Sequence, residues 1–438
     1  MPPPCAPAWH RGTPRPERHL MPRMRWFLTV PALVALSCRS GLAAMPQPAA
    51  SGPEPTVAMC GPLAVVTAPA GAMPERTAAV PERTAALPAP AGAAPARAAP
   101  MHGPRAAPPS STSAFPRNVV LLVGDGMGPS HFAAARLLRG DAFEAGRFPV
   151  TGLVATASAS SRVTDSAAAA SAMATGHKVN NKMLSVDAEG RPLPTLLELA
   201  EGQGRATGLV TTTFFGDATP AAFAVHTARR EQVTGIVDQL LASQVDLIAG
   251  TGAELFGRDG LPELPAAASK QGWTLITEPA ALASAPASKA LAVFPSQKND
   301  VDVPGARLPT LARWALERLA KDPDGFFLVV EHEGTDKASH ENAADDLRAS
   351  LRSFDETVGV VADFARQRGD TLVLVMGDHE TGGLRVVAEG AGDVALEFGS
   401  TVHTGSLVPL FALGPGAERF VGLYENTEIH RKVRALLR

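Results

Sequence analysis

The sequence predicts an α/β fold with a mostly parallel central β-sheet and helices on both faces of that sheet. Short, continuously apolar runs recur from about residue 118 onward, and amphipathic helical segments separate them. Runs without polar alternation are expected of strands that are buried on both faces. Strands that alternate with helices are typical of parallel sheets covered by helices on either side.

The expected elements follow one another along the chain. The first is a strand in the run RNVVLLVGDGMG at 117–128, and Pro129 opens the helical pattern that follows, at an early position that proline favours. Further strands are expected within 151–159, 205–213, 245–250, 325–331, 371–383 and 407–414. Further helices are expected within 193–204, 231–243, 308–321 and 342–369, the last with an apolar stripe of Leu347, Leu351, Phe354, Val358 and Val361. Residues 253–305 are rich in Ala, Pro and Gly and show no clear pattern.

The alanine-rich segment VTDSAAAASAMATGHKVNNK at 163–182 is expected to contain one more helix. Alanine is the strongest helix former, Asp165 or Ser166 suits the N-cap, and Gly176 suits the residue just past the C-terminus. These residues alone leave two interpretations of Ser166 open: a helix cap, or a nucleophile at the start of a helix.

The chain is expected to have three parts: a leader at 1–45, a Pro/Ala-rich disordered tether at 46–114 and a globular domain at 115–438. Basic Arg23 and Arg25 precede an apolar stretch that is too short to span a bilayer, and small residues follow, as in a secretory signal. A lipid-attachment role for Cys38 is a less favoured alternative. The tether has too few apolar residues to pack. We therefore expect an exported protein, periplasmic or secreted, without a transmembrane span.

The net charge and the positions of the cysteines limit the possible functions. A formal net charge of −3 over 438 residues gives no electrostatic basis for binding nucleic acid. All three cysteines, Cys5, Cys38 and Cys60, precede the globular domain. That domain therefore has no disulfide and no thiolate ligand. A metal there must be bound by His, Asp or Glu, and a nucleophile must be a hydroxyl or a carboxylate.

Three of the expected strands end in acidic residues. Asp125 follows the first strand, Glu331 follows the run FFLVV, and Asp378-His379 follows TLVLVMG. Ligands of open α/β sheets bind at the carboxyl ends of the strands, so these residues are expected at one edge. One acidic residue after a strand is usually a helix cap or a turn former, whereas three together indicate a site.

Two more segments add candidate metal ligands. Asp336 and His340, in EHEGTDKASH, share a face if the segment is helical, and one cation could bridge them. His403 lies in a loop with Gly and Ser, just before the last apolar strand. Taken singly, each histidine is equally well explained by a structural or surface role.

Convergence of these residues would place four carboxylates in one pocket: those of Asp125, Glu331, Asp336 and Asp378. Repulsion and desolvation would force several of them to protonate unless divalent cations were bound. Imidazole with carboxylate is a zinc-like ligand set, and ligation by oxygen alone suits magnesium. Three divalent ions would leave a net positive site that attracts a phosphate dianion.

Six short motifs occur in this order along the chain: GDGMG, TDSAAAASAMATG, DATPAAFAVH, EHEGTDKASH, GDHETGG and HTG. Their order and context resemble those of the alkaline phosphatase family, from about residue 118 to residue 416. The combination is highly specific, although GDG or HTG alone would mean little. The resemblance implies an alkaline-phosphatase-like fold, a catalytic domain at 115–438, and hydrolysis of phosphate monoesters to inorganic phosphate with two zinc ions and one magnesium ion.

The resemblance also implies roles for individual residues. Ser166 resembles the nucleophile that forms a phosphoserine intermediate. The implied metal ligands are, for the first zinc, Asp336, His340 and His403; for the second zinc, Asp125, Asp378 and His379; and for magnesium, Asp125, Thr219 and Glu331. Glu333 is an alternative magnesium ligand, but Glu331 has the family's spacing to Asp336.

The phosphate-binding residues follow from the same comparison of motifs. The family's phosphate-gripping arginine falls at Arg230, with neighbouring Arg229 as the alternative. Asp217 and Lys337 resemble a pair that supports the magnesium and the phosphate through water in some bacterial members. Lys337 stands where vertebrate relatives place a histidine, so the bacterial pattern is expected. Residues 381–402 leave little room for the surface domain that some relatives insert there, and the resemblance implies a homodimer.

The chemistry of the residues agrees with these roles. A serine hydroxyl is a weak nucleophile without a base or a metal, and the nearest histidine in sequence, His177, lies beyond the helix. Two-metal displacement would supply the activation, and the helix N-terminus at Ser166 would favour a phosphate. Arg230 would offer a planar fork to two phosphate oxygens.

Other functions fit these residues less well. A phosphodiesterase of the same superfamily could share the metals, but Arg230 favours a monoester because it would grip oxygens that a diester partly blocks. The C/S-x-P-x-R motif expected of a sulfatase does not occur in the sequence. A non-catalytic phosphate- or metal-binding protein is disfavoured by the intact Ser166 and the complete ligand set.

Overall fold

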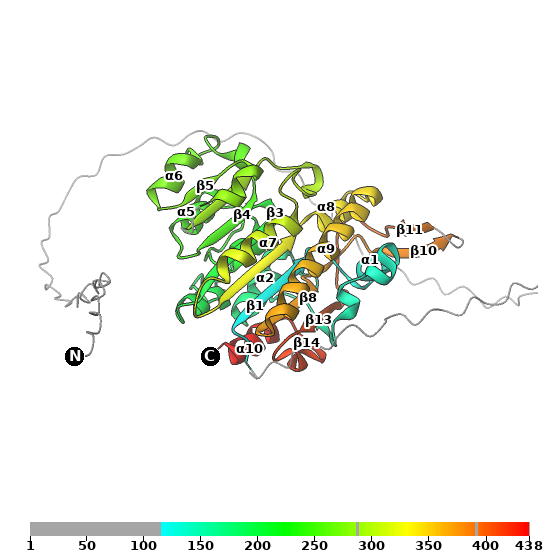
Figure 1. The fold of residues 1–438 in the computed structure, drawn as a ribbon. Coiled ribbons are helices and arrows are strands. Elements are labelled where there is room, and N and C mark those ends of the chain that lie inside the picture. Colours follow the sequence, from blue (N-terminus) through cyan, green and yellow to red (C-terminus); the bar gives the residue numbers. More distant parts are fainter. Residues whose placement is uncertain (1–114, 286–288, 390–392, 438) are drawn as a thin grey trace, which may run out of the picture. The chain divides into compact units, whose positions relative to one another are not determined.

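A ten-stranded β-sheet forms the centre of the structure (Figure 1). The computed structural model describes residues 115–285, 289–389 and 393–437. The strands of the sheet are β1 (Asn118–Gly124), β2 (Val150–Ala155), β3 (Ala206–Phe214), β4 (Leu247–Thr251), β5 (Thr274–Ile276), β6 (Ala290–Phe294), β7 (Phe326–His332), β8 (Thr371–Gly377), β13 (Val408–Leu413) and β14 (Gly422–Glu425). They lie in the order β14-β2-β13-β8-β1-β7-β3-β4-β6-β5. Only β13 runs antiparallel to its neighbours, β2 and β8, which confirms the prediction of a mostly parallel sheet.

Helices cover both faces of the sheet, as the sequence predicts. One face packs against α2 (Ser166–Thr175), α3 (Leu196–Glu201), α4 (Ala218–Ala222), α5 (Val233–Ala242), α6 (Leu264–Lys270) and α10 (Thr427–Leu436). The other face packs against α1 (Pro129–Arg139), α7 (Leu308–Leu319) and α9 (Ala344–Arg368). The predicted stripe of α9 is buried along its whole length.

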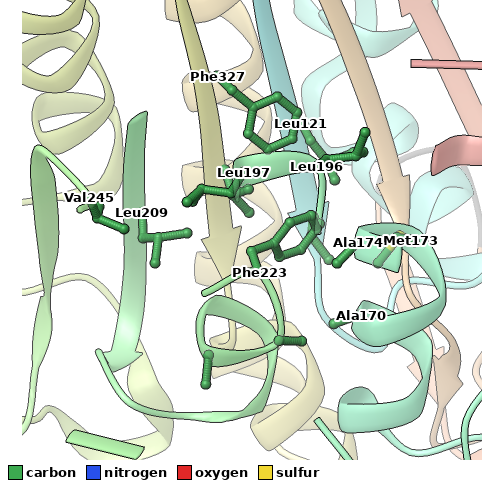
Figure 2. Packing of buried hydrophobic residues seen from close by; sticks show 14 of the residues in the cluster. Leu121, Ala170, Met173, Ala174, Leu196, Leu197, Leu209, Phe223, Val245 and Phe327 are labelled. Carbon is green, nitrogen blue, oxygen red and sulfur yellow. The ribbon is translucent and has the colours of Figure 1, made fainter. Parts of the chain in front are cut away.

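The central strand shows how the sequence directs this layering. Val119, Leu121 and Val123 of β1 belong to the core beneath α2, whereas Val120 and Leu122 belong to the core beneath α9. Successive side chains of a strand point to opposite faces, so a continuously apolar strand supplies two cores at once. Figure 2 shows Leu121 and Phe327 of the sheet in the first core, with Met173 and Ala174 of α2 nearby.

Helix α2 is the alanine-rich helix that the sequence predicts. The Asp165 side chain caps it by accepting a hydrogen bond from the Ala168 backbone N–H at 3.0 Å. Gly176 follows the C-terminus with a left-handed φ of 75°, which glycine adopts without strain. All ten residues are buried, and the helix packs against both α4 and α10. Small side chains are what allow a helix to be surrounded so closely.

The structure adds elements where the sequence showed no clear pattern. Residues 253–305 contain α6, β5 and β6, and the two strands extend one edge of the sheet. These elements are short and rich in alanine, so they show no clear hydrophobic periodicity. Within 381–402, the described residues form the antiparallel pair β10 (Arg385–Glu389) and β11 (Asp393–Glu397), in agreement with the small insertion expected there.

The predicted leader, the predicted tether and Cys38 lie outside the described residues. Among the helices that the structure does describe, none is long and apolar enough to cross a membrane.

Candidate active site

The site is built where three parallel strands end side by side. Strand β1 lies between β7 and β8, with Val123 opposite Glu331 and Gly124 opposite Gly377. Asp125 and Asp378 therefore leave neighbouring strands at the same level. Asp125, Glu331, Asp378 and His379 are each at most 1% exposed. The structure brings these strand-end side chains to one edge of the sheet.

A second set of ligating side chains reaches this edge from α8 (Gly334–His340) and from the strand pair β9 (Glu380–Thr381) and β12 (His403–Thr404). The segment with Asp336 and His340 is helical, and His340 Nε2 lies 3.2 Å from Asp336 Oδ2. His403 Nε2 lies 3.6 Å from Asp336 Oδ1 and 3.1 Å from His340 Nε2. The His403 ring stacks on His379 with centroids 3.7 Å apart.

Backbone carbonyls orient two of these imidazoles. His403 Nδ1 lies 3.0 Å from the carbonyl oxygen of Thr164, and His340 Nδ1 lies 2.7 Å from that of Thr401. A carbonyl can only accept, so each Nδ1 must carry the proton. Each Nε2 faces Asp336, and with Nδ1 protonated it is the nitrogen that can give up its proton to bind a metal.

Among the residues that the structure describes, three groups of side chains have the geometry to hold a cation: Asp336, His379 and His403; Asp125, Asp378 and His379; and Asp125, Glu331 and Glu333. In each group, the ligating atoms lie within 4.8 Å of one another. His379 links the first group to the second, and Asp125 links the second to the third. The three groups therefore form a continuous row.

Several carboxyl groups of this row would need nearby positive charge to be ionised at neutral pH. Burial and the neighbouring acids raise the pKa of Asp125 well above its usual range. Burial raises the pKa of Glu331 to about 8 and that of Asp378 to about 7. Despite its own burial, the pKa of Asp336 lies below its usual value because of its hydrogen bond to His340 and the neighbouring imidazoles.

Unsatisfied oxygens indicate that cations fit this row. Both carboxylate oxygens of Asp125 and Oδ2 of Asp378 are buried without a hydrogen-bond partner in the described part of the chain. An orphaned buried carboxylate oxygen is costly, and a cation would satisfy it. Imidazoles with a carboxylate at one end suit zinc, and oxygens alone at the other end suit magnesium.

Ser166 lies at the N-terminus of α2 beside this row. Its Oγ is 3.2 Å from His379 Nε2, which is also 3.4 Å from Asp125 Oδ1. The free backbone N–H groups of the first turn of α2 favour an anion next to Ser166. The structure thus places the predicted nucleophile beside the predicted ligands.

The structure also distinguishes the two arginines. Arg230 Nη2 lies 2.7 Å from Asp217 Oδ1, and Nη1 lies 3.7 Å from Asp165 Oδ2. The side chain is therefore held next to Ser166, whereas Arg229 is exposed. Asp217 caps α4, the helix that carries buried Thr219. The Thr219 hydroxyl is buried and has no hydrogen-bond partner among the described residues.

Sequence reasoning missed three contributions to the site. The sequence indicates only a helix-capping role for Asp165, but in the structure Asp165 also faces Arg230. Thr381 donates a hydrogen bond to Asp336 Oδ1, and Thr211 donates one to Glu331 Oε2 at 2.5 Å. Nothing in the sequence distinguishes these threonines from other threonines in strands. Asp165 does have a signal, because it directly precedes the predicted nucleophile Ser166.

The fold and the site define an α/β enzyme with its functional side chains at the carboxyl edge of the sheet. The family model for alkaline phosphatase matches residues 116–396. The chain is 30% identical to the alkaline phosphatase of Escherichia coli (strain K12) over 411 residues, which cover 73% of this chain and 86% of that protein. The chain belongs to the alkaline phosphatase family and is a phosphatase, a hydrolase of phosphate monoesters.

Solved structures agree with this assignment. The alkaline phosphatase from the Antarctic bacterium TAB5 superimposes with a TM-score of 0.69 at 29% identity, over 74% of this chain and 98% of that one. A mutant of the TAB5 enzyme with Mg bound in the M3 site matches with a TM-score of 0.67 at 28% identity, with the same coverage of each chain.

Proposed function

We propose that the chain hydrolyses phosphate monoesters through a phosphoserine intermediate on Ser166, with two zinc ions and one magnesium ion as cofactors. The observation that carries this proposal is the position of Ser166 Oγ, 3.2 Å from His379 Nε2, because His379 links two of the three groups that have the geometry to hold a cation. The N-terminus of α2 adds partial positive charge at the same point.

The proposed ligand sets differ from the three groups of the row at two places: His340 stands in place of His379 in the first set, and Thr219 in place of Glu333 in the third. Asp336, His340 and His403 would bind the first zinc, Asp125, Asp378 and His379 the second, and Asp125, Thr219 and Glu331 the magnesium. The close approach of His340 to both Asp336 and His403 supports its place in the first set. The all-oxygen character of the third set supports magnesium, and a structural relative binds Mg in its M3 site.

The bound cations would supply positive charge for the attacking and leaving oxygens of the displacement. Ser166 Oγ forms a bond to phosphorus as the ester P–O bond breaks, and the leaving alcohol takes up a proton. Water then cleaves the phosphoserine, which releases inorganic phosphate and restores the Ser166 hydroxyl. Arg230 binds two phosphate oxygens with its planar fork, and Asp165 and Asp217 hold that fork in place. Lys337 and Asp217 support the phosphate and the magnesium through water.

The alternative is a phosphodiesterase activity at the same site. Purified protein, loaded with zinc and magnesium, should be assayed with p-nitrophenyl phosphate and with bis-p-nitrophenyl phosphate. We expect a higher kcat/KM for the monoester, loss of activity on chelation and recovery when zinc and magnesium return. A higher kcat/KM for the diester would favour the alternative.

Export and assembly complete the proposal. The basic and apolar layout before residue 46 supports a protein that works in the periplasm or outside the cell. Membership of the family supports a homodimer. Cell fractionation and sedimentation of the mature protein test these two statements separately.

A further inference from the structure

We propose that Glu333 is a fourth protein ligand at the magnesium position and that it shares its carboxylate between that cation and Lys337. This inference rests on the proposed function, because it concerns the same metal centre. It assigns a role to a side chain that the family motif does not use.

Glu333 belongs to the third group of the row and lies directly after β7. It is the N-cap residue of α8, with a helical backbone of φ −73° and ψ −31°. One carboxylate oxygen of Glu333 lies within 4.8 Å of ligating oxygens from both Asp125 and Glu331. The Glu333 side chain is only 7% exposed, so it does not extend into solvent.

The backbone holds Glu333 in this position. Its N–H donates to Thr212 Oγ1 at 3.0 Å. The next residue, Gly334, is closely surrounded: a Cβ there would lie 2.8 Å from both the Asp300 carbonyl oxygen and Ser350 Oγ. The chain therefore has little freedom to withdraw the Glu333 carboxylate from the cluster.

Charge indicates that this cluster holds a ligand. Both carboxylate oxygens of Asp125, which is 0% exposed, have no hydrogen-bond partner among the residues that the structure describes. Lys337 Nζ lies 3.2 Å from Glu333 Oε1 and offers one positive charge to the three carboxyl groups of Asp125, Glu331 and Glu333. Ionisation of all three acids needs further positive charge, which a divalent cation would supply.

A simpler role for Glu333 would be to hold Lys337 in position and nothing more. The two roles predict different effects on metal binding. A ligand contributes directly to magnesium affinity, whereas a residue that only orients Lys337 does not. Lys337 itself repels a cation, so its removal should strengthen magnesium binding in either case.

The test is isothermal titration of MgCl₂ into zinc-loaded protein, with four chains compared: wild type, Glu333→Gln, Lys337→Met and Glu341→Gln. Glutamine keeps the shape of Glu333 and removes its charge. We expect Glu333→Gln to weaken magnesium binding by at least ~10-fold, the loss typical of groups that support a metal site. Lys337→Met should tighten it. Glu341 is exposed and directly follows α8, the helix that begins after Glu333. Glu341→Gln is therefore the matched control and should leave the magnesium affinity unchanged.

The outcomes separate this inference from the function on which it rests. Wild-type affinity in Glu333→Gln would overturn the inference and leave the phosphatase mechanism intact. A wild type that binds no magnesium beyond its zinc would overturn the magnesium assignment itself, and this inference with it. Anomalous maps of wild-type crystals soaked in MnCl₂ avoid any folding defect of the variant. A Glu333 oxygen within about 2.6 Å of the ion supports the inference, and one beyond about 3.5 Å overturns it.

Discussion

Ser166 Oγ lies 3.2 Å from Nε2 of His379, although 213 positions separate the two residues in the chain. The contact joins the first turn of an alanine-rich helix to the end of a central strand. It places a hydroxyl next to the ligating atoms of two cation-binding groups, because His379 belongs to both.

Replacement of Ser166 by alanine should therefore abolish turnover. We expect kcat for p-nitrophenyl phosphate to fall at least ~10³-fold, since the covalent step loses its nucleophile. Mass spectrometry after acid quenching should detect phosphoserine at position 166 in the wild type alone. Exposed Ser160 is the matched control, and Ser160→Ala should keep wild-type kcat. Full activity in Ser166→Ala would remove the covalent mechanism.

Arg230 should contribute to phosphate binding and Arg229 should not. Arg230 is held by Asp165 and Asp217 beside Ser166, whereas Arg229 is exposed. Loss of a charge-assisted bidentate contact is expected to cost about 3 kcal/mol, so Arg230→Ala should lower kcat/KM by about 100-fold and weaken inhibition by inorganic phosphate. Arg229→Ala should change either quantity by less than about 2-fold. The reverse pattern would assign the phosphate contact to Arg229.

The alanines of α2 should not tolerate larger side chains. Ala170 is fully buried in the core shown in Figure 2, where the helix packs against α4 and α10. Ala170→Leu should lower the free energy of unfolding by about 1–3 kcal/mol because the added atoms have no space. Ala133→Leu, on the exposed side of α1, should change it by less than about 0.5 kcal/mol. Urea unfolding measures both, and equal stabilities would show that α2 is loosely packed.

Glu201 should make stability depend on pH independently of the metal centre. Burial, assisted by Glu198 and Asp246, raises the pKa of Glu201 from 4.5 to about 7, although Thr207 donates a hydrogen bond to it. The folded protein then binds the proton more tightly than the unfolded chain, so the contribution to stability is present below pH 4.5 and is lost as the pH rises to about 7.

Glu201→Gln removes the ionisation and should therefore raise Tm relative to wild type by a few degrees at pH 8, with little difference at pH 5. Thermal melts at the two pH values measure this, and effects of pH on the rest of the protein cancel in the difference. A Tm difference that is the same at both pH values would show that Glu201 ionises normally.

The sequence predicts the fold well where the pattern is long and strongly apolar. Strands β1, β7 and β8 are continuous apolar runs, and α9 has a complete stripe, so the centre of the sheet and its helical cover were expected. Strands β5 and β6 are short, with no alternation to indicate them. Their place in the sheet depends on the pairing of β6 with β4 and of β5 with β6, and β4 and β6 are distant segments of the chain.

The sequence predicts which side chains gather at the site, but not how they are arranged there. Asp125 and Asp378 follow strands directly, and the rule for carboxyl ends of parallel strands places them together. The contact between Ser166 and His379, and the grip of Asp165 on Arg230, depend on how α2 packs against the sheet. Glu333 differs from both cases. The spacing to Asp336 favours Glu331 as the ligand, whereas the structure brings the carboxylates of Glu331 and Glu333 to the same group.

Zinc-edge anomalous diffraction from crystals grown with zinc tests the central claim most directly, since the claim is that side chains between positions 125 and 403 form one metal centre. The account predicts two peaks about 4 Å apart, each within about 2.2 Å of its assigned ligands, with Ser166 beside them. A map without peaks at these side chains, or with zinc bound only at unrelated surface residues, would contradict it.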